Sequence, residues 1–432
     1  MRPWRNAAGA CGLADMKEEW SLSRGRTLTA RSEDLVVRLE YRQEQQPEDS
    51  SQRPERTRIT VRPHGVVLPL SLHPESVRTT QDRKLAARDI ETGDFNFDDA
   101  FYVTGPQTPA RAALDAQTRR RLLDLLIMGE LEVVNGVIRI DFVTASSDLY
   151  ELTLTRLLRN VLDAARRLGW PPDVVVRLAE NARHDPVAWV RKENLLTLVR
   201  EFPEHASTRD VLRAACTDPS DDVRVRAATA LGRAGRETLM EIAEREQADD
   251  AAAARAIAAL GRLLTSDRVQ AILGRALRAR RVETARACLL LLGHGGGTET
   301  LGLLEKVLRV EKGGLAVAAI QGLAATGLTA VERPLIEALA RDISDVRVAA
   351  AEALGRIGSP RAVLPLKEAE AGHPRDADLR RATRQAVAHI QSRAPGASPG
   401  QLSLAADAEG SLSLAEDERG RLSLLSDRRP LE

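Results

Sequence analysis

The stretch Asp221-Asp-Val-Arg-Val-Arg-Ala-Ala-Thr-Ala-Leu-Gly232 decides the fold, and it returns later in the chain as Asp345-Val-Arg-Val-Ala-Ala-Ala-Glu-Ala-Leu-Gly355. Both copies place small or apolar residues three or four positions apart, which is the spacing of one face of an α-helix. Each copy closes on a glycine, a residue that favours the end of a helix. The recurrence of this helix indicates a repeating unit.

Weaker copies lie between and around these two, and the position of Leu231 and Leu354, which precede the glycine in the two strong copies, sets their common register. The register residues are Leu198, Leu231, Leu260, Leu292, Leu323, Leu354 and Val387. Their spacings of 33, 29, 32, 31, 31 and 33 residues are typical of an α-solenoid, in which helix pairs bury their apolar faces against neighbouring pairs. The sequence therefore predicts a mainly α fold, with a solenoid of about seven helix pairs over residues 171–391.

The unit around Leu231 shows how one pair is expected to fold. Residues 211–215 begin it with a first amphipathic helix, and 218–221 interrupt that helix because proline lacks an N–H and Asp or Ser can cap the next helix. The second helix then buries Leu231 in the seam between pairs. Gly235 is expected to end the unit in a left-handed conformation.

The order Asp, then Val-Arg, then Ala-x-x-Ala-Leu-Gly resembles the HEAT-repeat family, especially the short bacterial type also seen in phycobilisome lyase-like proteins. The motif residues are Asp218, Val223-Arg224, Ala227 and Ala230-Leu231-Gly232, then Asp342, Val346-Arg347, Ala350 and Ala353-Leu354-Gly355, and more loosely Asp185 and Val190-Arg191. The resemblance covers residues 171–391, implies a helical solenoid and says almost nothing about activity. Arg191, Arg224 and Arg347 are expected to bond to the aspartates between helices, Asp185, Asp218 and Asp342, and so to tie successive repeats together.

The residues before the array predict a different architecture. Residues 1–30 read as a disordered leader and 31–170 as a small α+β domain with a connecting helix. Its expected strands are 34–40, 58–61, 66–70 and 101–103, its expected helices are 112–127 and 149–168, and its hairpin is 131–143, with Asn135-Gly136 at the turn. The domain resembles, weakly, a module that precedes HEAT units in other bacterial proteins.

An acidic run in this domain, Asp94, Asp98 and Asp99, raises the question of a calcium site. Its spacing is not that of a calcium-binding loop, and no glutamate closes one. Capping and turn formation are the better interpretation.

Residues 392–432 read as a linker and a tail with its own ten-residue period. Leu-Ser-Leu recurs at 402–404, 412–414 and 422–424. Disorder is the first interpretation, because so few apolar residues cannot bury a core. The second is a set of short docking peptides that add to a sheet edge and gain avidity from repetition.

Composition limits the class of protein. The chain has 432 residues, with 63 basic against 62 acidic side chains, so bulk charge does not drive it onto nucleic acid or anionic lipid. Two of its three cysteines, Cys216 and Cys288, fall in helices of different repeats, which argues against a disulfide framework. With no apolar run long enough for a membrane span, a reducing cytoplasm is the expected location.

The sequence contains no complete set of catalytic or metal-ligating residues. No histidine is followed by glutamate, so the His-Glu pairs of the HEAT-repeat di-iron hydroxylase are absent. Cys-x-x-Cys and a phosphate-binding loop are absent as well. Glu-x-x-His occurs once, at residues 370–373, and Gly-x-Ser-x-Gly once, in the linker at residues 396–400, and neither is part of a ligand set or a catalytic triad in the sequence. No catalytic residue, metal or cofactor is therefore predicted.

One periodic feature suggests a binding surface. Two positions after each register residue stand Arg200, Arg233, Arg262, His294, Ala325, Arg356 and His389. Because equivalent positions stack along a solenoid, these form a mostly basic column near the ends of the second helices. The arginines also complement the helix dipole, by about 0.3–1 kcal/mol each, which explains them without a partner.

The functional hypothesis is a non-enzymatic scaffold or adaptor that binds a protein partner of unknown identity on the concave face of the array. The candidate contacts are Arg200, Arg233, Arg262 and Arg356. Two alternatives stay open. One is a nucleic-acid-binding protein that uses the same basic stripe, and the other is a lyase-like factor acting on a partner protein.

Overall fold

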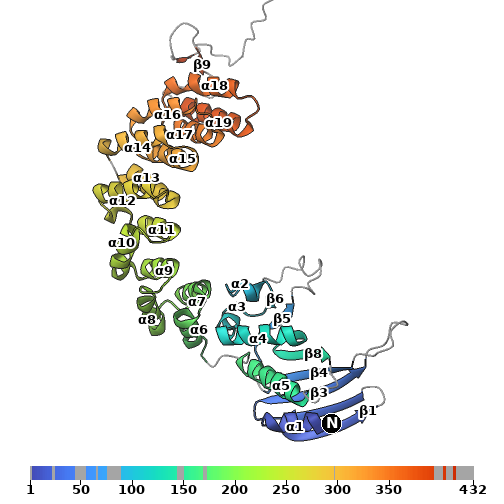
Figure 1. Ribbon diagram of the computed structural model, residues 1–432. Coiled ribbons are helices and arrows are strands. Elements are labelled where there is room, and N and C mark those ends of the chain that lie inside the picture. The colour runs from blue at the N-terminus through green and yellow to red at the C-terminus, as the bar shows by residue number, and fades with distance from the viewer. Residues whose placement is uncertain are drawn as a thin grey trace, which may run out of the picture. The chain divides into compact units, whose positions relative to one another are not determined.

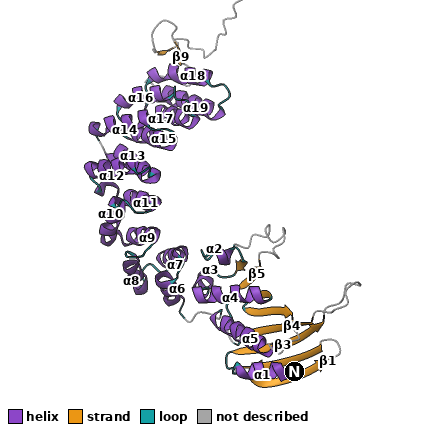
Figure 2. Cartoon of the chain, viewed as in Figure 1, coloured by secondary structure: helices purple, strands orange, loops and turns teal. Residues whose placement is uncertain are grey.

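The structure is a computed structural model, and helices make up most of what it describes (Figure 2). The described residues are 2–21, 25–43, 55–64, 67–74, 89–143, 150–168, 173–295, 297–393, 402–404 and 412–414. The chain divides into two compact units, residues 1–235 and 236–432. The first unit therefore contains both the N-terminal domain and the first helix pairs.

A sheet of eight described strands forms the start of the first unit, in the order β1-β2-β3-β4-β8-β7-β5-β6 (Figure 1). All its neighbouring strands run antiparallel. The strands are β1 (Ala14–Ser21), β2 (Gly25–Arg31), β3 (Leu35–Gln43), β4 (Glu55–Pro63), β5 (Ser71–Pro74), β6 (Phe101–Thr104), β7 (Glu130–Val134) and β8 (Val137–Val143). The strands predicted at 34–40, 58–61 and 101–103 correspond to β3, β4 and β6, whereas residues 67–70 form no strand.

The hairpin of β7 and β8 is as predicted. Asn135 and Gly136 have φ angles of 49° and 73°, the left-handed pair that a type I′ turn requires. Alternate residues of both strands are buried, among them Val133 and Ile140. The turn fixes the register, and the alternation points one face of the hairpin into the core.

The disordered leader predicted for residues 1–30 is wrong over the part that the structure describes. Helix α1 (Arg2–Ala10) packs against α5 (Tyr150–Arg167), and α5 lies on β3, β4 and β8. Trp4 is only 5% exposed, and its indole N–H donates to the hydroxyl of Tyr150 at 2.8 Å. The polar composition of this stretch hides a helix with one apolar face, whose partner lies far along the chain.

Two helices occupy the region where one was predicted, α3 (Gln107–Ala113) and α4 (Ala116–Met128). The break falls before Asp115, whose carboxylate accepts the Thr118 N–H at 2.8 Å and caps α4. Upstream, Asp98 of the short helix α2 (Phe95–Asp98) accepts the amides of Thr92 and Gly93. The acidic run thus includes a turn-forming residue, in line with the expectation.

Two helix pairs complete the first unit. They are α6 (Val174–His184) with α7 (Ala188–Glu201), and α8 (Ala206–Ala215) with α9 (Asp221–Leu231). The left-handed glycine after α9 is Gly232, with φ 58°, and not Gly235 as predicted. Gly235 is buried against the backbone of Ala228, where a Cβ would collide, so it is required for space.

Five helix pairs are described in the second unit: α10 (Arg236–Glu244) and α11 (Asp250–Leu260), α12 (Ser266–Arg278) and α13 (Val282–Gly295), α14 (Thr298–Val310) and α15 (Gly313–Ala325), α16 (Glu332–Ala338) and α17 (Ser344–Ile357), and α18 (Val363–Gly372) and α19 (Ala377–Arg393). The second helices, α11, α13, α15, α17 and α19, pack on one another in sequence order (Figure 1). Short 3₁₀ turns join several of the helices, including Gly261–Leu263.

Register residues of the second unit lie in this layer. Leu260, Leu292, Leu323 and Leu354 are buried, as the repeat predicts. Leu231, at the end of α9, is only half-buried. It therefore fills less of the seam than predicted.

Glycines beside the register residues, Gly322 before Leu323 and Gly355 after Leu354, let the second helices approach closely. A Cβ on Gly322 would lie 2.6 Å from the carbonyl oxygen of Leu289, and one on Gly355 would lie 2.9 Å from Cα of Ala386. No side chain fits there without a shift of the backbone. A leucine next to a glycine thus combines a buried side chain with a close helix contact.

Part of the tail is described. Strands β9 (Leu402–Leu404) and β10 (Leu412–Leu414) pair antiparallel, with Leu412 opposite Leu404. The third Leu-Ser-Leu copy and the rest of the predicted tail lie outside the described residues. No helix in the described part of the chain is both long and apolar enough to cross a membrane.

Candidate functional site

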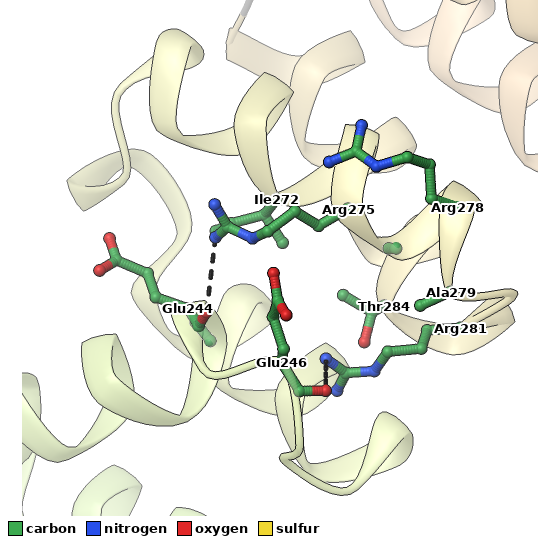
Figure 3. A pocket seen from close by; sticks show the side chains of 10 residues that line it. Glu244, Glu246, Ile272, Arg275, Arg278, Ala279, Arg281 and Thr284 are labelled. Atoms are coloured by element: carbon green, nitrogen blue, oxygen red, sulfur yellow. Dashed lines mark hydrogen bonds between the residues drawn. The ribbon is translucent and has the colours of Figure 1, made fainter.

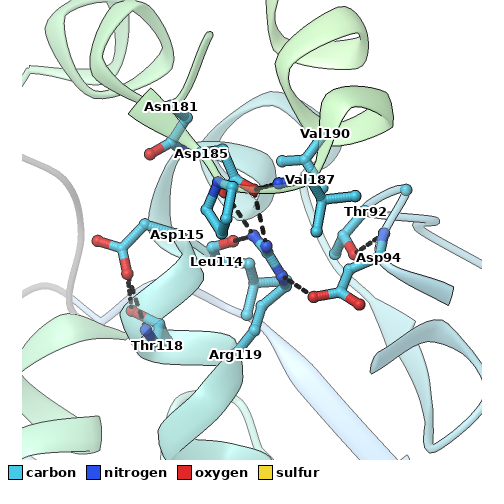
Figure 4. A network of polar contacts seen from close by, with 12 residues as sticks. Thr92, Asp94, Leu114, Asp115, Thr118, Arg119, Asn181, Asp185, Val187 and Val190 are labelled. Atoms are coloured by element: carbon cyan, nitrogen blue, oxygen red, sulfur yellow. Dashed lines mark hydrogen bonds and ion pairs between the residues drawn. The ribbon is translucent and has the colours of Figure 1, made fainter. Parts of the chain in front are cut away.

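A buried ion cluster around Arg119 joins the N-terminal domain to the first helix pair (Figure 4). Its Nη1 and Nη2 donate to the two carboxylate oxygens of Asp185 at 3.0 and 3.1 Å, and its Nε donates to Asp94 at 2.9 Å. The side chains of Arg119 and Asp185 are each 1% exposed. Burial by itself lowers the guanidinium pKa, but the bonds and charges of Asp185 and Asp94 outweigh it, and the pKa of Arg119 is raised.

Arg191 repeats this arrangement one helix pair further on. Its Nε and Nη2 bond to both oxygens of Asp218 at 2.7 Å, and its Nη1 donates to the backbone carbonyl of Asp185 at 2.8 Å. Arg119 likewise donates from Nη1 to a backbone carbonyl, that of Leu114 at 2.9 Å. Arg119 of α4 therefore takes the place of a motif arginine from a preceding repeat.

Arg347 makes the corresponding contacts in the second unit. Its Nη1 donates to the carbonyl of Arg341 at 2.7 Å and its Nη2 to Asp376 at 3.1 Å. The hydroxyl of Ser344, the amide of Leu379 and Arg347 together hold the pKa of Asp376 at about 2. This carboxylate is therefore ionised down to strongly acidic pH.

The expected pairing of motif arginines needs correction. The side chains of Arg191 and Arg347 bond to the carboxylate of the following pair, Asp218 or Asp376, whereas in its own unit Arg191 bonds to the backbone carbonyl of Asp185. Asp342 is exposed, and Arg224 donates instead to the carbonyl of Cys216 at 3.0 Å and to Asp221 at 3.4 Å. The arginines do tie successive repeats together, as expected. Which aspartate each arginine bonds depends on how far one helix pair rises above the next.

A hollow of about 290 Å³ lies beside α10, α12 and α13 (Figure 3). Arg275 and Arg281 line it, but they donate to backbone carbonyls, Arg275 to Glu244 at 3.4 Å and Arg281 to Glu246 at 3.2 Å. Arg281 also donates to Ala248 at 2.8 Å. These cations cap the C-terminal end of α10, so the hollow is not evidence of a ligand site.

A second hollow, of about 420 Å³, lies beside α14 and α16, and here too an arginine caps the C-terminal end of a helix. Arg341 lines it and donates to the carbonyls of Arg309 at 3.2 Å and Glu311 at 2.8 Å. In α13, burial raises the pKa of the Cys288 thiol to about 12, although the charges of Arg275 and Arg281 lower it, so the thiol form dominates at neutral pH. Within the residues that the structure describes, no group of three or more His, Cys, Asp and Glu could hold a metal ion.

The third hollow contains two members of the predicted basic column. Arg262 and His294 line this space of about 400 Å³ together with Ser266. Its other lining residues are Leu264, Val269, Leu291, Leu292 and Gly295. The ring of His294 is oriented by Nδ1, which lies 2.8 Å from the carbonyl of Leu290. Equivalent positions of adjacent pairs thus meet at one site.

The other members of the column are divided between the units. Arg356 and His389 are exposed near the ends of α17 and α19, whereas Arg200 and Arg233 belong to the first unit. Arg200 pairs with Glu201 at 2.8 Å. Across the described parts of the chain, no ion pair engages Arg233, Arg262 or Arg356.

The sequence pattern did not single out Arg119, because this residue lies outside the repeats and is not part of the repeat motif. Its charge and its burial on a helix face with Leu122 and Leu125 were the only signals available. A buried arginine demands a carboxylate, but 66 residues separate Arg119 from Asp185 in the sequence.

Comparisons with known proteins agree with the repeat architecture. Residues 314–388, which cover most of α15 to α19, match the family model described as HEAT repeats. The chain therefore carries HEAT repeats there, in a mainly helical fold with a small N-terminal sheet domain.

One solved structure that matches is human deoxyhypusine hydroxylase in complex with glycerol. It is 18% identical, with a TM-score of 0.22, and the match covers 50% of this chain and 96% of that one. No curated protein matches the chain.

Proposed function

We propose, with the HEAT repeats as the premise, that this chain is a non-enzymatic scaffold that binds a protein partner along the ends of its second helices. The contact surface is the basic row, defined as Arg262, His294, Arg356 and His389 of the second unit. Arg200 and Arg233 remain candidates for a separate contact on the first unit.

The observation that carries this proposal is the contrast between two kinds of arginine. One kind donates hydrogen bonds to carboxylates or backbone carbonyls inside the array, as Arg191, Arg281 and Arg347 do. Arg262 and Arg356 are exposed, and no ion pair engages them in the described residues. An exposed, unengaged arginine costs little to bring into an interface, and arginine is enriched among residues that dominate binding energy.

A protein partner fits the row better than a nucleic acid. The chain has a net charge of only +1. The row alternates two arginines with two histidines, and the uncharged Ala325 occupies the equivalent position between His294 and Arg356. A phosphate backbone calls for a denser field and gives affinity that falls steeply with salt. An acidic protein surface needs only a few matched charges.

Charge reversal tests the proposal. In the chain with Arg262→Glu and Arg356→Glu, we expect partners captured from native extract to fall at least tenfold, because like charges that face each other cost several kcal/mol. The matched control is Arg333→Glu on α16, where the side chain is 89% exposed and pairs with Glu337 in the next turn. If the double variant captures the same partners, the proposal is wrong. If the wild-type chain instead binds RNA or DNA with an affinity that falls steeply as the salt concentration rises, the nucleic-acid alternative takes its place.

A further inference from the structure

The hollow at Arg262 and His294 combines two chemistries. Its basic wall consists of the exposed side chains of these two residues, contributed by adjacent helix pairs. Its remaining lining is largely apolar, with Leu264, Val269 and Leu292 each at most 5% exposed. The site therefore suits a segment that offers a carboxylate beside an aliphatic side chain.

The chain's own tail offers this combination in its second copy, Ser-Leu-Ser-Leu-Ala-Glu-Asp-Glu-Arg-Gly at residues 411–420. Three consecutive acids, Glu416 to Glu418, follow two leucines, against one arginine. The third copy, residues 421–430, keeps Leu-Ser-Leu but has three arginines against one aspartate. Charge thus separates two otherwise similar segments.

Distance permits this contact within one chain. Three steps between second helices separate α13 from α19, which at roughly 10 Å a step is about 30 Å. From Arg393 at the end of α19 to Leu402 at the start of β9 the chain takes nine Cα–Cα steps, which can span about 30–32 Å when extended. β9 and β10 can stay paired in this contact, because Glu416 to Glu418 follow the last residue of β10, Leu414, by only two to four positions.

We infer that residues 411–420 dock into the hollow at Arg262 and His294, with a carboxylate at the basic wall and a leucine in the apolar part. The tail then competes with the partner for one end of the basic row. This inference rests on the proposed function, because it uses the same surface.

A labelled peptide of residues 411–420 tests the docking by fluorescence anisotropy. The receptor is the full chain with Glu416→Lys, Asp417→Lys and Glu418→Lys, whose own tail no longer competes. We expect this chain to bind the peptide, and the wild-type chain to bind it at least tenfold more weakly. The peptide of residues 421–430 is the matched control and should not bind.

Arg262→Glu, added to the lysine-substituted chain, locates the site. We expect it to weaken peptide binding at least tenfold, whereas Arg333→Glu should leave it unchanged. Equal binding of the two peptides, or insensitivity to Arg262→Glu, overturns the inference. Dimerisation of the wild-type chain that is lost in the lysine-substituted chain would instead assign the occupant to a second copy and overturn docking within one chain.

The two proposals fail separately. If the peptide does not bind but Arg262→Glu with Arg356→Glu still removes the captured partner, only the tail docking falls. If the peptide binds as expected and the partner is retained, the row is not the partner's surface.

Discussion

Replacing Arg119 with alanine should destabilise the first unit more than any surface change. The guanidinium bonds both oxygens of Asp185 and one of Asp94, and the side chains of Arg119 and Asp185 are almost fully buried. Removing the guanidinium leaves Asp185 as a buried carboxylate without its ion-pair partner. The carboxylate still accepts the amide of Val187 at 3.0 Å.

The magnitude follows from this burial. Breaking a buried ion pair from one side costs about 3–5 kcal/mol, because the desolvated charge that remains is not compensated. With an urea dependence of about 2–3 kcal/mol per molar for a unit of this size, the midpoint should fall by about 1–2.5 M. The matched control is Arg166→Ala in the same unit, which breaks an exposed pair with Asp34 and should cost about 0–1 kcal/mol.

Tryptophan fluorescence is a selective assay for this change. All four tryptophans, Trp4, Trp20, Trp170 and Trp189, belong to the first unit. Urea unfolding followed at the tryptophan emission therefore reports that unit without a signal from residues 236–432. An Arg119→Ala midpoint no lower than that of Arg166→Ala would refute the reasoning.

Three further predictions concern the repeats. Gly322→Ala should destabilise the second unit by about 1–3 kcal/mol through the close helix contact, whereas Gly302→Ala, in open space on α14, should stabilise it by about 0.5–1 kcal/mol, both by calorimetry. Leu354→Ala should cost about 2–5 kcal/mol, and Leu231→Ala clearly less because Leu231 is half-buried; equal losses in urea unfolding would contradict the packing. The folded pKa of Asp376 lies near 2, below the usual 3.8, so the stability that it contributes is present above about pH 4 and is lost as pH falls towards 2. Asp376→Asn should flatten this acid dependence in circular dichroism, and an unchanged acid limb would show that other carboxylates set it.

Local sequence pattern predicted the elements whose stabilising contacts are close in the chain or repeat at a fixed period. The β7–β8 hairpin follows from Asn135-Gly136, and the burial of Leu354 follows from the repeat register. The same periodicity predicted that Arg262 and His294 lie together, because equivalent positions of adjacent pairs stack, and both residues line one hollow.

Contacts that depend on distant partners escaped prediction. Burial of α1 depends on Tyr150 and α5, which follow it by more than a hundred residues. The motif arginines bond to an aspartate of the next repeat, as Arg191 does to Asp218. This choice depends on the rise between helix pairs, which the local sequence does not specify. The packed array likewise decides which arginines bond inside it and which do not. Nothing in the local sequence distinguishes Arg262 from Arg281.

The central claim is that the partner sits on the ends of the second helices, and site-specific photo-crosslinking in native extract tests it most directly. A benzophenone side chain in place of Arg356 should crosslink the partner, while the same group in place of Arg333 on the first-helix layer should not. The claim would be contradicted by crosslinks from the Arg333 position with none from the Arg356 position.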